Sequence, residues 1–347
     1  MSPKIGLIAT INNSGLGQMA KQFHRNVDVY MHFVIPHHEK GTDLEFVRGD
    51  YIVADQWDAS LDANFRRFLA SKPDIAVIFE YPYNWHFLPQ LKAAGIKIVW
   101  FPMIDSVGTP WIRKSGYIGL IDLFVSPSQY CHNTLTQEGL PSVYLPWPID
   151  TEYFAFTPRG VDRPLTFLHN IGHGGDGMRK GWDFVFQAWR RIDQSGCRLI
   201  VHSQIPVDPG LLRNVDFRLG NFPQAVDLYK EGDVYLSPSR REGLGLPFRE
   251  AMSCGIPVIG SNIPPLNEVI PDVDWLVEAP ASGPIGRVQN GLVYQPNTGS
   301  LMMKMLAAKA CNNLPERSSR ARAHIERCHS WTTLGPIMKD IFEAVAA

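Results

Sequence analysis

The chain has 347 residues, of which 45% are hydrophobic and 19% are charged, as in an ordinary globular protein long enough for two domains. Its 33 Lys and Arg residues nearly balance its 34 Asp and Glu residues. This balance argues against a protein that gains its affinity from the phosphates of a nucleic acid.

Apolar runs alternate with helical patterns along the whole chain, which is typical of parallel sheets covered by helices. In the first half we expect strands at 4–9, 27–35, 75–79, 96–101, 122–126 and 142–145, and helices at 15–25, 61–70, 86–94 and 129–138. In the second half we expect strands at 165–171, 198–202, 215–218, 233–237 and 256–260, and helices at 181–193, 223–230 and 247–254. A hairpin-like stretch at 275–294 precedes a largely helical tail from 301 to 347. The pattern predicts an α/β protein with two Rossmann-like, doubly wound domains.

Prolines at 146 and 148 interrupt regular structure and mark the predicted domain boundary. We expect a first domain at 1–148, a second at 149–325, and a last helix at 326–347 that packs back on the first domain. Open sheets of this kind bind ligands at the carboxyl ends of their strands, which predicts a site in a cleft between two facing domains.

A short sequence occurs twice, once in each predicted domain. Asp122 begins Asp-Leu-Phe-Val-Ser-Pro-Ser, and Asp233 begins Asp-Val-Tyr-Leu-Ser-Pro-Ser. A Gly-x-Pro step follows each copy, and the second copy is five residues longer between its Asp and that Pro. The repetition indicates related architecture in the two halves, although common strand-turn chemistry could also produce it.

The second copy opens the most informative stretch, Ser237-Pro-Ser-Arg-Arg-Glu-Gly-Leu-Gly-Leu-Pro-Phe-Arg-Glu250. Pro247 fits the first turn of a helix, and the two preceding glycines let the backbone approach a ligand. The amides before that helix can hold a diphosphate, and we expect Gly243, Leu244, Gly245 and Leu246 to contact it. Glu242 and Glu250 then need hydroxyl partners, which a sugar and a ribose would supply. Each glutamate taken alone is better interpreted as a solvated surface residue, and it is the whole string that favours the functional interpretation.

The stretch from Glu242 to Val258 resembles the signature of the retaining glycosyltransferases of family four and their relatives, E-G-[FL]-G-L-P-x-x-E-A-M-x-x-G-x-P-V. The resemblance implies a GT-B-type fold and transfer of a hexose from a UDP-, GDP- or ADP-linked sugar with retention. We expect no cofactor besides the nucleotide-sugar donor. We also expect no metal, because basic residues and the helix start already supply leaving-group stabilisation. The resemblance also implies that Glu242 faces the donor sugar and that Glu250 holds the ribose, the two ends of a Glu-x7-Glu motif.

Family members place a basic pair against the donor diphosphate, and Arg179 and Lys180 occupy that place after the strand 165–171. Two cations there would offset charge on the departing phosphate. Many relatives carry an arginine directly after the strand's glycine, where this chain has His173. An exposed Arg-Lys pair without function is the alternative.

The first strand runs into a glycine loop, with Gly15, Gly17 and Ala20 in a G-x-G-x-x-A pattern. Alone, this pattern is compatible with a nicotinamide dinucleotide site that uses Glu39 as its acidic residue. The resemblance instead places Gly15 and Gly17 against donor phosphate or acceptor.

Relatives often have a histidine after a middle strand of the first domain, and here Asp105 is the nearest polar residue. Asp105 could bond a sugar hydroxyl or could cap a turn or helix. Two metal-like patterns, Asp272-Val-Asp274 and His37-His38-Glu39, are weak, and we expect no metal.

The sequence predicts no zinc or disulfide framework, because its five cysteines are scattered without a Cys-x-x-Cys pair. It also lacks a leader pattern at MSPKIGLIAT and a long apolar run, so we expect a cytoplasmic protein, at most peripheral to a membrane. The acceptor could be a glycan, a lipid-linked sugar, a small molecule or, against the charge balance, a modified DNA base. Rival functions are a nucleotide-sugar epimerase or hydrolase, a dinucleotide-dependent oxidoreductase, and a non-catalytic binding protein.

Overall fold

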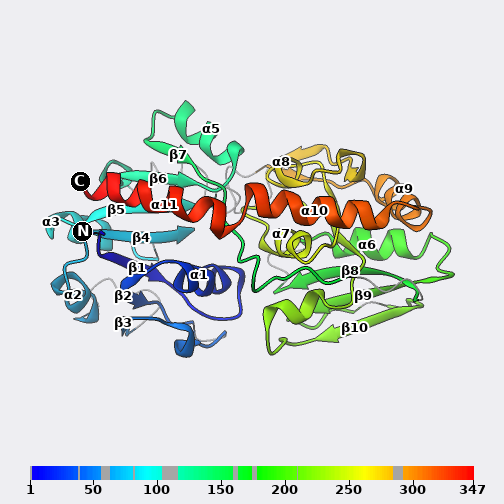
Figure 1. Cartoon of the computed structure of the whole chain (residues 1–347), viewed down its shortest axis with the longest axis horizontal. Coiled ribbons are helices and arrows are strands. Elements are labelled where there is room, and N and C mark those ends of the chain that lie inside the picture. Colours follow the sequence, from blue (N-terminus) through cyan, green and yellow to red (C-terminus); the bar gives the residue numbers. More distant parts are fainter. Residues whose placement is uncertain are drawn as a thin grey trace. The chain divides into compact units, whose positions relative to one another are not determined.

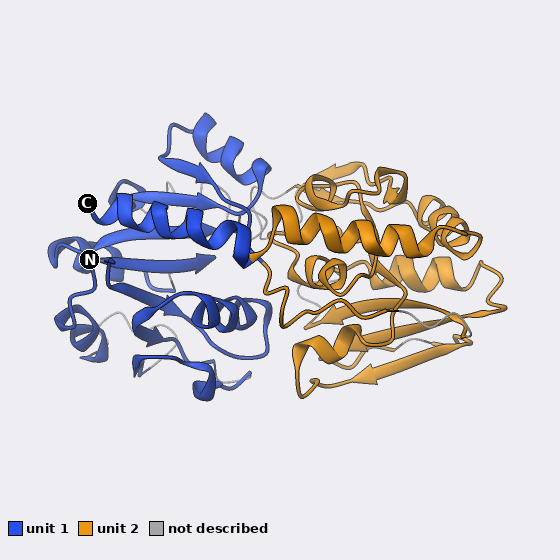
Figure 2. Cartoon of the chain, in the orientation of Figure 1, with its two compact units in different colours: residues 1–148, 286–291, 331–347 blue, residues 149–285, 292–330 orange. Residues whose placement is uncertain are grey.

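The structure is a computed structural model that describes residues 2–37, 40–55, 63–80, 83–103, 116–158, 163–173, 178–208, 210–283 and 292–347. Its chain forms two compact units (Figure 2). Unit 1 contains Met1–Pro148, Gly286–Gly291 and Trp331–Ala347, and unit 2 contains Ile149–Ile285 and Leu292–Ser330. The predicted boundary at 325/326 lies inside helix α10 (Leu314–Cys328), which ends only where His329 leaves the helical conformation at φ −139° and ψ 18°.

Unit 1 is built on a parallel sheet in the order β3-β2-β1-β4-β5-β6-β7 (Figure 1). The strands are β1 (Ile5–Ala9), β2 (Val29–Val34), β3 (Asp50–Val53), β4 (Ile75–Glu80), β5 (Lys97–Pro102), β6 (Leu123–Ser126) and β7 (Ser142–Tyr144). The helices are α1 (Gly15–Asn26), α2 (Ala63–Ala70), α3 (Phe87–Ala93), α5 (Gln129–Gln137) and α11 (Trp331–Ala346), with 3-10 turns at η1 (Leu44–Phe46) and η2 (Ile118–Leu120). The central strands β1 and β4 are buried on both faces, which explains their continuous apolar runs.

Two parts of unit 1 need long-range contacts to explain them. Strand β3 was not predicted, because it is an edge strand in which only Ile52 is buried. Helix α11 packs against β4 and brings Trp331 into an aromatic cluster with Phe23 and Trp147, at ring-centroid distances of 6.3 and 5.9 Å. The C-terminal helix therefore completes the core of unit 1.

Two buried histidines in unit 1 form a hydrogen-bonded chain. His24 Nε2 lies 2.9 Å from His32 Nδ1, and His32 Nε2 lies 3.0 Å from the carbonyl oxygen of Ala9. The amide of Arg48 donates to His24 Nδ1 at 3.3 Å. Every nitrogen is satisfied only when both rings are neutral. Burial lowers the pKa of His24 to about 4 and that of His32 to about 3.

We expect the free energy of unfolding to fall as the pH drops from 7.5 to 5.0. An unfolded histidine takes up a proton near pH 6.5 while the folded pair stays neutral, so acid favours the unfolded chain. The free energy of unfolding is unaffected by these histidines above pH 6.5 and falls as the pH drops from there towards 4. At pH 5 the loss is about 2 kcal/mol for each histidine that stays neutral in the folded protein. Urea unfolding of the wild type and of His24→Gln at both pH values measures it. An equal loss in the two proteins would contradict the assignment to this pair.

Unit 2 is built on a second parallel sheet, in the order β10-β9-β8-β11-β12-β13. Its strands are β8 (Leu165–Gly172), β9 (Cys197–Ser203), β10 (Val215–Leu219), β11 (Val234–Ser237), β12 (Val258–Ser261) and β13 (Leu276–Val277). Its helices are α6 (Trp182–Trp189), α7 (Leu246–Ser253), α8 (Leu266–Val269), α9 (Thr298–Lys309) and α10, with 3-10 turns at η3 (Ala225–Tyr229) and η4 (Val273–Trp275). The two doubly wound parallel sheets confirm the predicted fold class.

Two predicted elements of unit 2 differ in detail. The helix expected at 223–230 is the 3-10 turn η3, because Pro223 and Gly232 leave only a short segment between them that can form helical turns. The hairpin-like stretch contains an antiparallel pair, β14 (Ala281–Gly283) with β15 (Val293–Tyr294).

The repeated Asp occupies matching places in the two sheets. Asp122 accepts from the amide of Ile98 at 2.8 Å, and its own amide donates to the Ile98 carbonyl at 3.0 Å. Asp233 makes the same pair of bonds to Thr166, at 2.8 and 2.7 Å. Each carboxylate also has a cation, Lys92 in unit 1 and Arg163 in unit 2. The repeated residue thus fixes the start of β6 against β5 and of β11 against β8.

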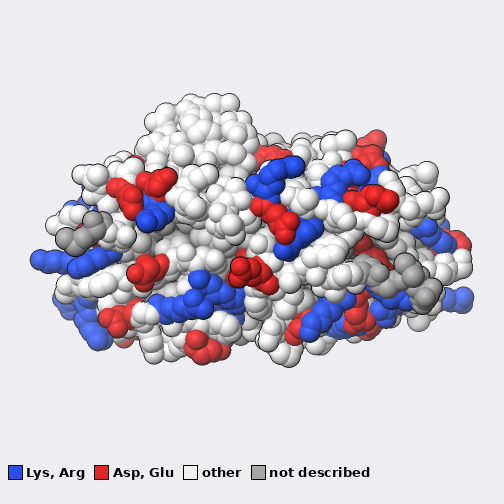
Figure 3. Space-filling view, viewed as in Figure 1, with Lys and Arg blue, Asp and Glu red and all other residues white. Residues whose placement is uncertain are grey.

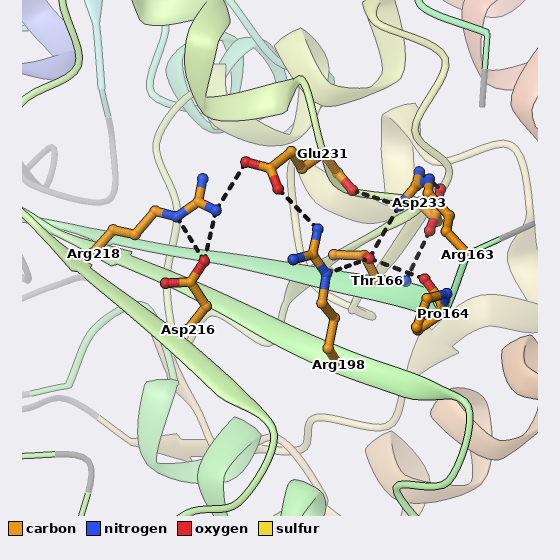
Figure 4. A network of polar contacts seen from close by, with 8 residues as sticks. All are labelled: Arg163, Pro164, Thr166, Arg198, Asp216, Arg218, Glu231 and Asp233. Atoms are coloured by element: carbon orange, nitrogen blue, oxygen red, sulfur yellow. Dashed lines mark hydrogen bonds and ion pairs between the residues drawn. The ribbon is translucent and has the colours of Figure 1, made fainter. Parts of the chain in front are cut away.

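Around Asp233 the pairing extends into a wider network (Figure 4). Arg198 donates to Thr166 Oγ1 at 3.0 Å and to Glu231 at 2.8 Å, and Arg218 reaches the other oxygen of Glu231 at 2.8 Å. The network joins strands β8, β9 and β10 to the segment before β11. Each of its cations has an acidic partner, so we assign it a structural role.

The surface in Figure 3 carries basic and acidic side chains interspersed over both units, without a broad area of one sign. This face offers no basic stripe for a nucleic acid. None of the helices in the described ranges combines the length and apolarity that a membrane crossing requires.

Candidate functional site

The site in unit 2 is built where β11 gives way to α7. Strand β11 ends at Ser237, and α7 begins at Leu246 with Pro247 in its first turn. Gly245 caps the helix in the left-handed conformation, at φ 73° and ψ 45°. A Cβ at this position would overlap the ring of Phe248, so only glycine fits. The eight residues between strand and helix form the loop that carries Glu242.

Glu242 lies between two cations from a distant part of the sequence. Its Oε2 is 2.5 Å from Lys180 Nζ, and its Oε1 is 3.4 Å from a guanidinium nitrogen of Arg179. The Glu242 side chain is 7% exposed, and those of Lys180 and Arg179 are 15% and 24% exposed. Burial alone would raise the pKa of Glu242, but the charges and hydrogen bonds of Lys180 and Arg179 outweigh it and lower the pKa to about 2. The trio carries a net single positive charge near neutral pH.

The segment bearing the two cations is fixed to the Glu242 loop. Arg240 donates to the carbonyl of Met178 at 2.9 Å and forms a bidentate pair with Asp183 at 2.8 Å. The amide of Arg240 also donates to the carbonyl of Arg179 at 2.8 Å. Gly181 has φ 70°, and a Cβ there would overlap the carbonyl oxygen of Pro238. Close backbone contact therefore sets the distance between cations and carboxylate.

Glu250 lies on α7 and is 5% exposed. It accepts a hydrogen bond from the hydroxyl of Tyr229 at 2.7 Å. Burial first, and then the negative charge of Glu250, holds the pKa of Tyr229 well above its usual value. Burial, and then the charges of Glu242 and Glu250, also hold the pKa of Tyr235 well above its usual value. Both glutamates therefore act on the same tyrosine.

A pocket opens beside Glu242 at the carboxyl ends of β8 and β11. Its polar lining includes His169, Asn170, Lys180, Ser237, Ser239 and Glu242. Gly245 and Pro247 contribute the beginning of α7 to the same pocket. A helix start, the ammonium group of Lys180 and the carboxylate of Glu242 thus line one pocket, while Arg179 contacts the other oxygen of Glu242. This arrangement suits a ligand with phosphate and hydroxyl groups.

The other residues predicted to bind the donor differ in how far they are buried. Leu244 and Leu246 have buried side chains, 6% and 5% exposed, so only their backbone atoms could serve a ligand. Gly243 lies in the loop between Glu242 and Leu244 and is partly buried. The predicted donor role of these backbones stays a prediction.

The glycine loop of unit 1 packs closely against Asn12. A Cβ on Gly17 would overlap the backbone of Asn12, which explains this glycine by packing within the loop. Gly15 is different, since a Cβ there would meet nothing within 4 Å. Ser14 caps α1 by accepting from the amide of Gly17 at 3.3 Å. Asp105 and Glu39, the other predicted residues of this half, lie outside the described residues.

The Asp-x-Asp pattern has structural partners. Asp272 and Asp274 both pair with Arg317, at 3.2 and 2.7 Å, and Asp272 also pairs with Arg320 at 2.7 Å. Their carboxylates are therefore engaged in holding α10. No cluster of three or more His, Cys, Asp or Glu side chains suited to a metal occurs within the described ranges.

Sequence reasoning missed Arg240 and Tyr229, which hold the cation segment and Glu250. Arg240 stands directly before the Arg241-Glu242 pair, but its partner Asp183 is 57 residues away. Tyr229 is 21 residues from Glu250. Such pairings follow from the fold and carry no local signal.

Parts of the chain are similar in sequence to known proteins. Residues 168–285 of unit 2 match the family model described as Glycosyl transferases group 1. A 51-residue segment is 51% identical to the O-antigen chain mannosyltransferase B of Escherichia coli, covering 15% of this chain and 13% of that protein. The chain therefore spans a small part of the curated relative it matches.

Solved structures extend the likeness to the whole chain. A glycosyltransferase from Rickettsia africae has a TM-score of 0.74 at 15% identity, over 99% of this chain and 98% of the other. HepE from Anabaena, in complex with UDP-glucose, has a TM-score of 0.71 at 13% identity, over 99% and 100%. The fold is GT-B. At these identities the GT-B likeness shows the fold alone, and the chemistry has to be argued from the site.

Proposed function

We propose that this chain is a glycosyltransferase that moves a hexose from a nucleotide-diphosphate sugar to an acceptor hydroxyl with retention of configuration. The observation that carries the proposal is the buried Glu242 between Lys180 and Arg179, in a pocket at the start of α7. The match of unit 2 to the glycosyltransferase model supports it. Glycan or polysaccharide assembly is the proposed setting, as the name of the mannosyltransferase relative suggests.

In the proposed mechanism, the acceptor attacks the same face of the sugar from which the nucleotide diphosphate leaves. Lys180, Arg179 and the amides of 243–246 stabilise the charge that develops on the departing phosphate. Glu242 stays ionised, because its pKa is about 2, and orients the hydroxyls of the donor sugar. Two fixed cations supply the leaving-group stabilisation, so the proposed reaction needs no metal.

Glu250 is the proposed ribose ligand. Tyr229 occupies one of its oxygens, and a ribose with two adjacent hydroxyls suits a buried carboxylate of this kind. The nucleotide could be UDP, GDP or ADP. The solved complex of HepE with UDP-glucose makes UDP-glucose the first donor to test.

Replacing Glu250 with alanine is expected to weaken nucleotide-sugar binding about 10- to 100-fold, because hydrogen bonds to a charged group contribute about 1.5–3 kcal/mol each. Isothermal titration with UDP-glucose, GDP-mannose and ADP-glucose measures the effect. Tyr229→Phe is the matched control, since it removes the tyrosine bond and keeps the carboxylate. Equal affinity of Glu250→Ala and wild type would remove Glu250 from the donor site, and no binding by wild type would contradict the proposed function.

A nucleotide-sugar hydrolase or epimerase on the same fold would use the same donor pocket. Chromatography of the products separates these reactions. Release of nucleotide without transfer to any acceptor would favour hydrolysis over the proposed function.

A further inference from the structure

The Ser-Pro-Ser repeat serves different purposes in the two units. In unit 1 Ser128 is the N-cap of α5, and its hydroxyl oxygen accepts from the amide of Cys131 at 3.1 Å. The helix begins at the next residue, Gln129. This serine therefore has the usual capping role, worth about 1 kcal/mol of stability.

The matching serine of unit 2 has no helix to cap. Five additional residues separate this copy from its Gly-x-Pro step, and α7 begins only at Leu246 with Gly245 as its cap. Ser239 is 1% exposed, and its hydroxyl has no hydrogen-bond partner among the described residues. It lines the same pocket as Glu242 and Lys180.

His169, which lines the same pocket, has a second unsatisfied atom. Its Nδ1 lies 2.9 Å from the carbonyl oxygen of Leu236, so Nδ1 carries the proton. Nε2 is then an acceptor, and within the described part of the chain it has no partner. Burial lowers the pKa of His169 to about 4, so the ring is neutral near pH 7. The ring lines the pocket and is 1% exposed.

Buried polar atoms are almost always hydrogen-bonded, and an orphaned one is costly. A neutral Nε2 can only accept, so the phosphate oxygens of a nucleotide sugar, which carry no hydrogen, cannot satisfy it. A hydroxyl can donate to Nε2 and can also accept from a serine. His169 Nε2 therefore needs a hydrogen-bond donor, which a hydroxyl group of a bound ligand can supply.

We propose that Ser239 and His169 hydrogen-bond hydroxyl groups of the bound nucleotide sugar and so help to select it. The inference rests on the proposed function, because the ligand is the donor of that reaction. The five additional residues then have a physical consequence, because α7 begins only at Leu246 and the Ser239 hydroxyl, which caps no helix, is left for the ligand.

Ser239→Ala tests the serine, with Ser128→Ala as its matched control. Ser239→Ala is expected to bind UDP-glucose or GDP-mannose, whichever the wild type binds, about three- to tenfold more weakly, with an unchanged melting temperature. Ser128→Ala is expected to lower the melting temperature and leave donor affinity unchanged. Titration with UDP or GDP alone separates the sources of the hydroxyl: a loss shared with the nucleoside diphosphate indicates the ribose, and a loss confined to the nucleotide sugar indicates the hexose.

Two substitutions test the histidine. His169→Asn keeps a donor towards Leu236 and removes the acceptor at Nε2, so it should lose donor affinity about three- to tenfold. His169→Gln places an amide oxygen near the position of Nε2 and should retain more affinity than His169→Asn. Wild-type affinity in both Ser239→Ala and His169→Asn would overturn the inference and would mean that a buried water fills the site. The proposed function would survive that result, whereas failure of the wild type to bind any nucleotide sugar would end both.

Discussion

Glu242→Gln is expected to lower the rate of sugar transfer about 10²- to 10³-fold, the loss typical when one fixed polar group of a transition-state site is removed. Glutamine keeps the size of the side chain but loses the charge that pairs with Lys180 and Arg179. The two cations would then repel each other across the site and lose their fixed positions. Steady-state rates with the donor identified by titration measure the effect.

Glu278→Gln is the control for Glu242→Gln, because Glu278 is exposed in the same unit. It should transfer sugar at the wild-type rate. The ionisation of Glu242 adds a pH test, since a carboxyl whose pKa is lowered to about 2 contributes stability above pH 4.5 and loses it as the pH falls towards 2. Between pH 5 and 9 its charge is constant, so a rate that depends on Glu242 should not fall from its protonation in that range. A Glu242→Gln enzyme with normal turnover would show that the carboxylate is not needed for catalysis.

The sheets could be predicted because their central strands carry their own signal. Strands β1 (Ile-Gly-Leu-Ile-Ala) and β4 (Ile-Ala-Val-Ile-Phe-Glu) are buried on both faces, so each contains an almost unbroken apolar run. Strand β3 lacks such a run, because an edge strand has one solvated side. The turn η3 was predicted as a full helix, because periodicity cannot show that a five-residue segment closes as a 3-10 turn.

The candidate site could be predicted from local sequence only where its residues are close together in the chain. The spacing from Glu242 to Glu250 belongs to one strand-loop-helix unit, and the motif marks it. Lys180 meets Glu242 across 62 residues, and only the family resemblance suggested that they would lie together. The Ser239 hydroxyl and His169 Nε2 have no hydrogen-bond partner in the described part of the chain. Nothing in the sequence indicates this, because an unsatisfied hydrogen bond is a property of the folded pocket.

Gly181→Ala is expected to reduce transfer by about 10²-fold, because displacement of a catalytic group by about 1 Å can cost that much. The new Cβ would overlap the carbonyl oxygen of Pro238, a backbone atom that cannot rotate away. The contact can be relieved only if the segment with Arg179 and Lys180 moves away from the loop that carries Glu242. Steady-state rates measure the loss of transfer. Urea unfolding should show that the free energy of unfolding is lower by an additional amount of about 1–3 kcal/mol because of overpacking.

Gly196→Ala separates this contact from the general cost of the left-handed backbone. Gly196 has φ 68°, close to the 70° of Gly181, and a Cβ there would meet nothing within 4 Å. Both variants should therefore lose about 1–2 kcal/mol of stability through the backbone conformation, but only Gly181→Ala should lose activity. Equal activity in the two variants would mean that the cation segment tolerates displacement. The donor diphosphate would then have to be held mainly by the amides at the start of α7, because those do not depend on the position of Lys180.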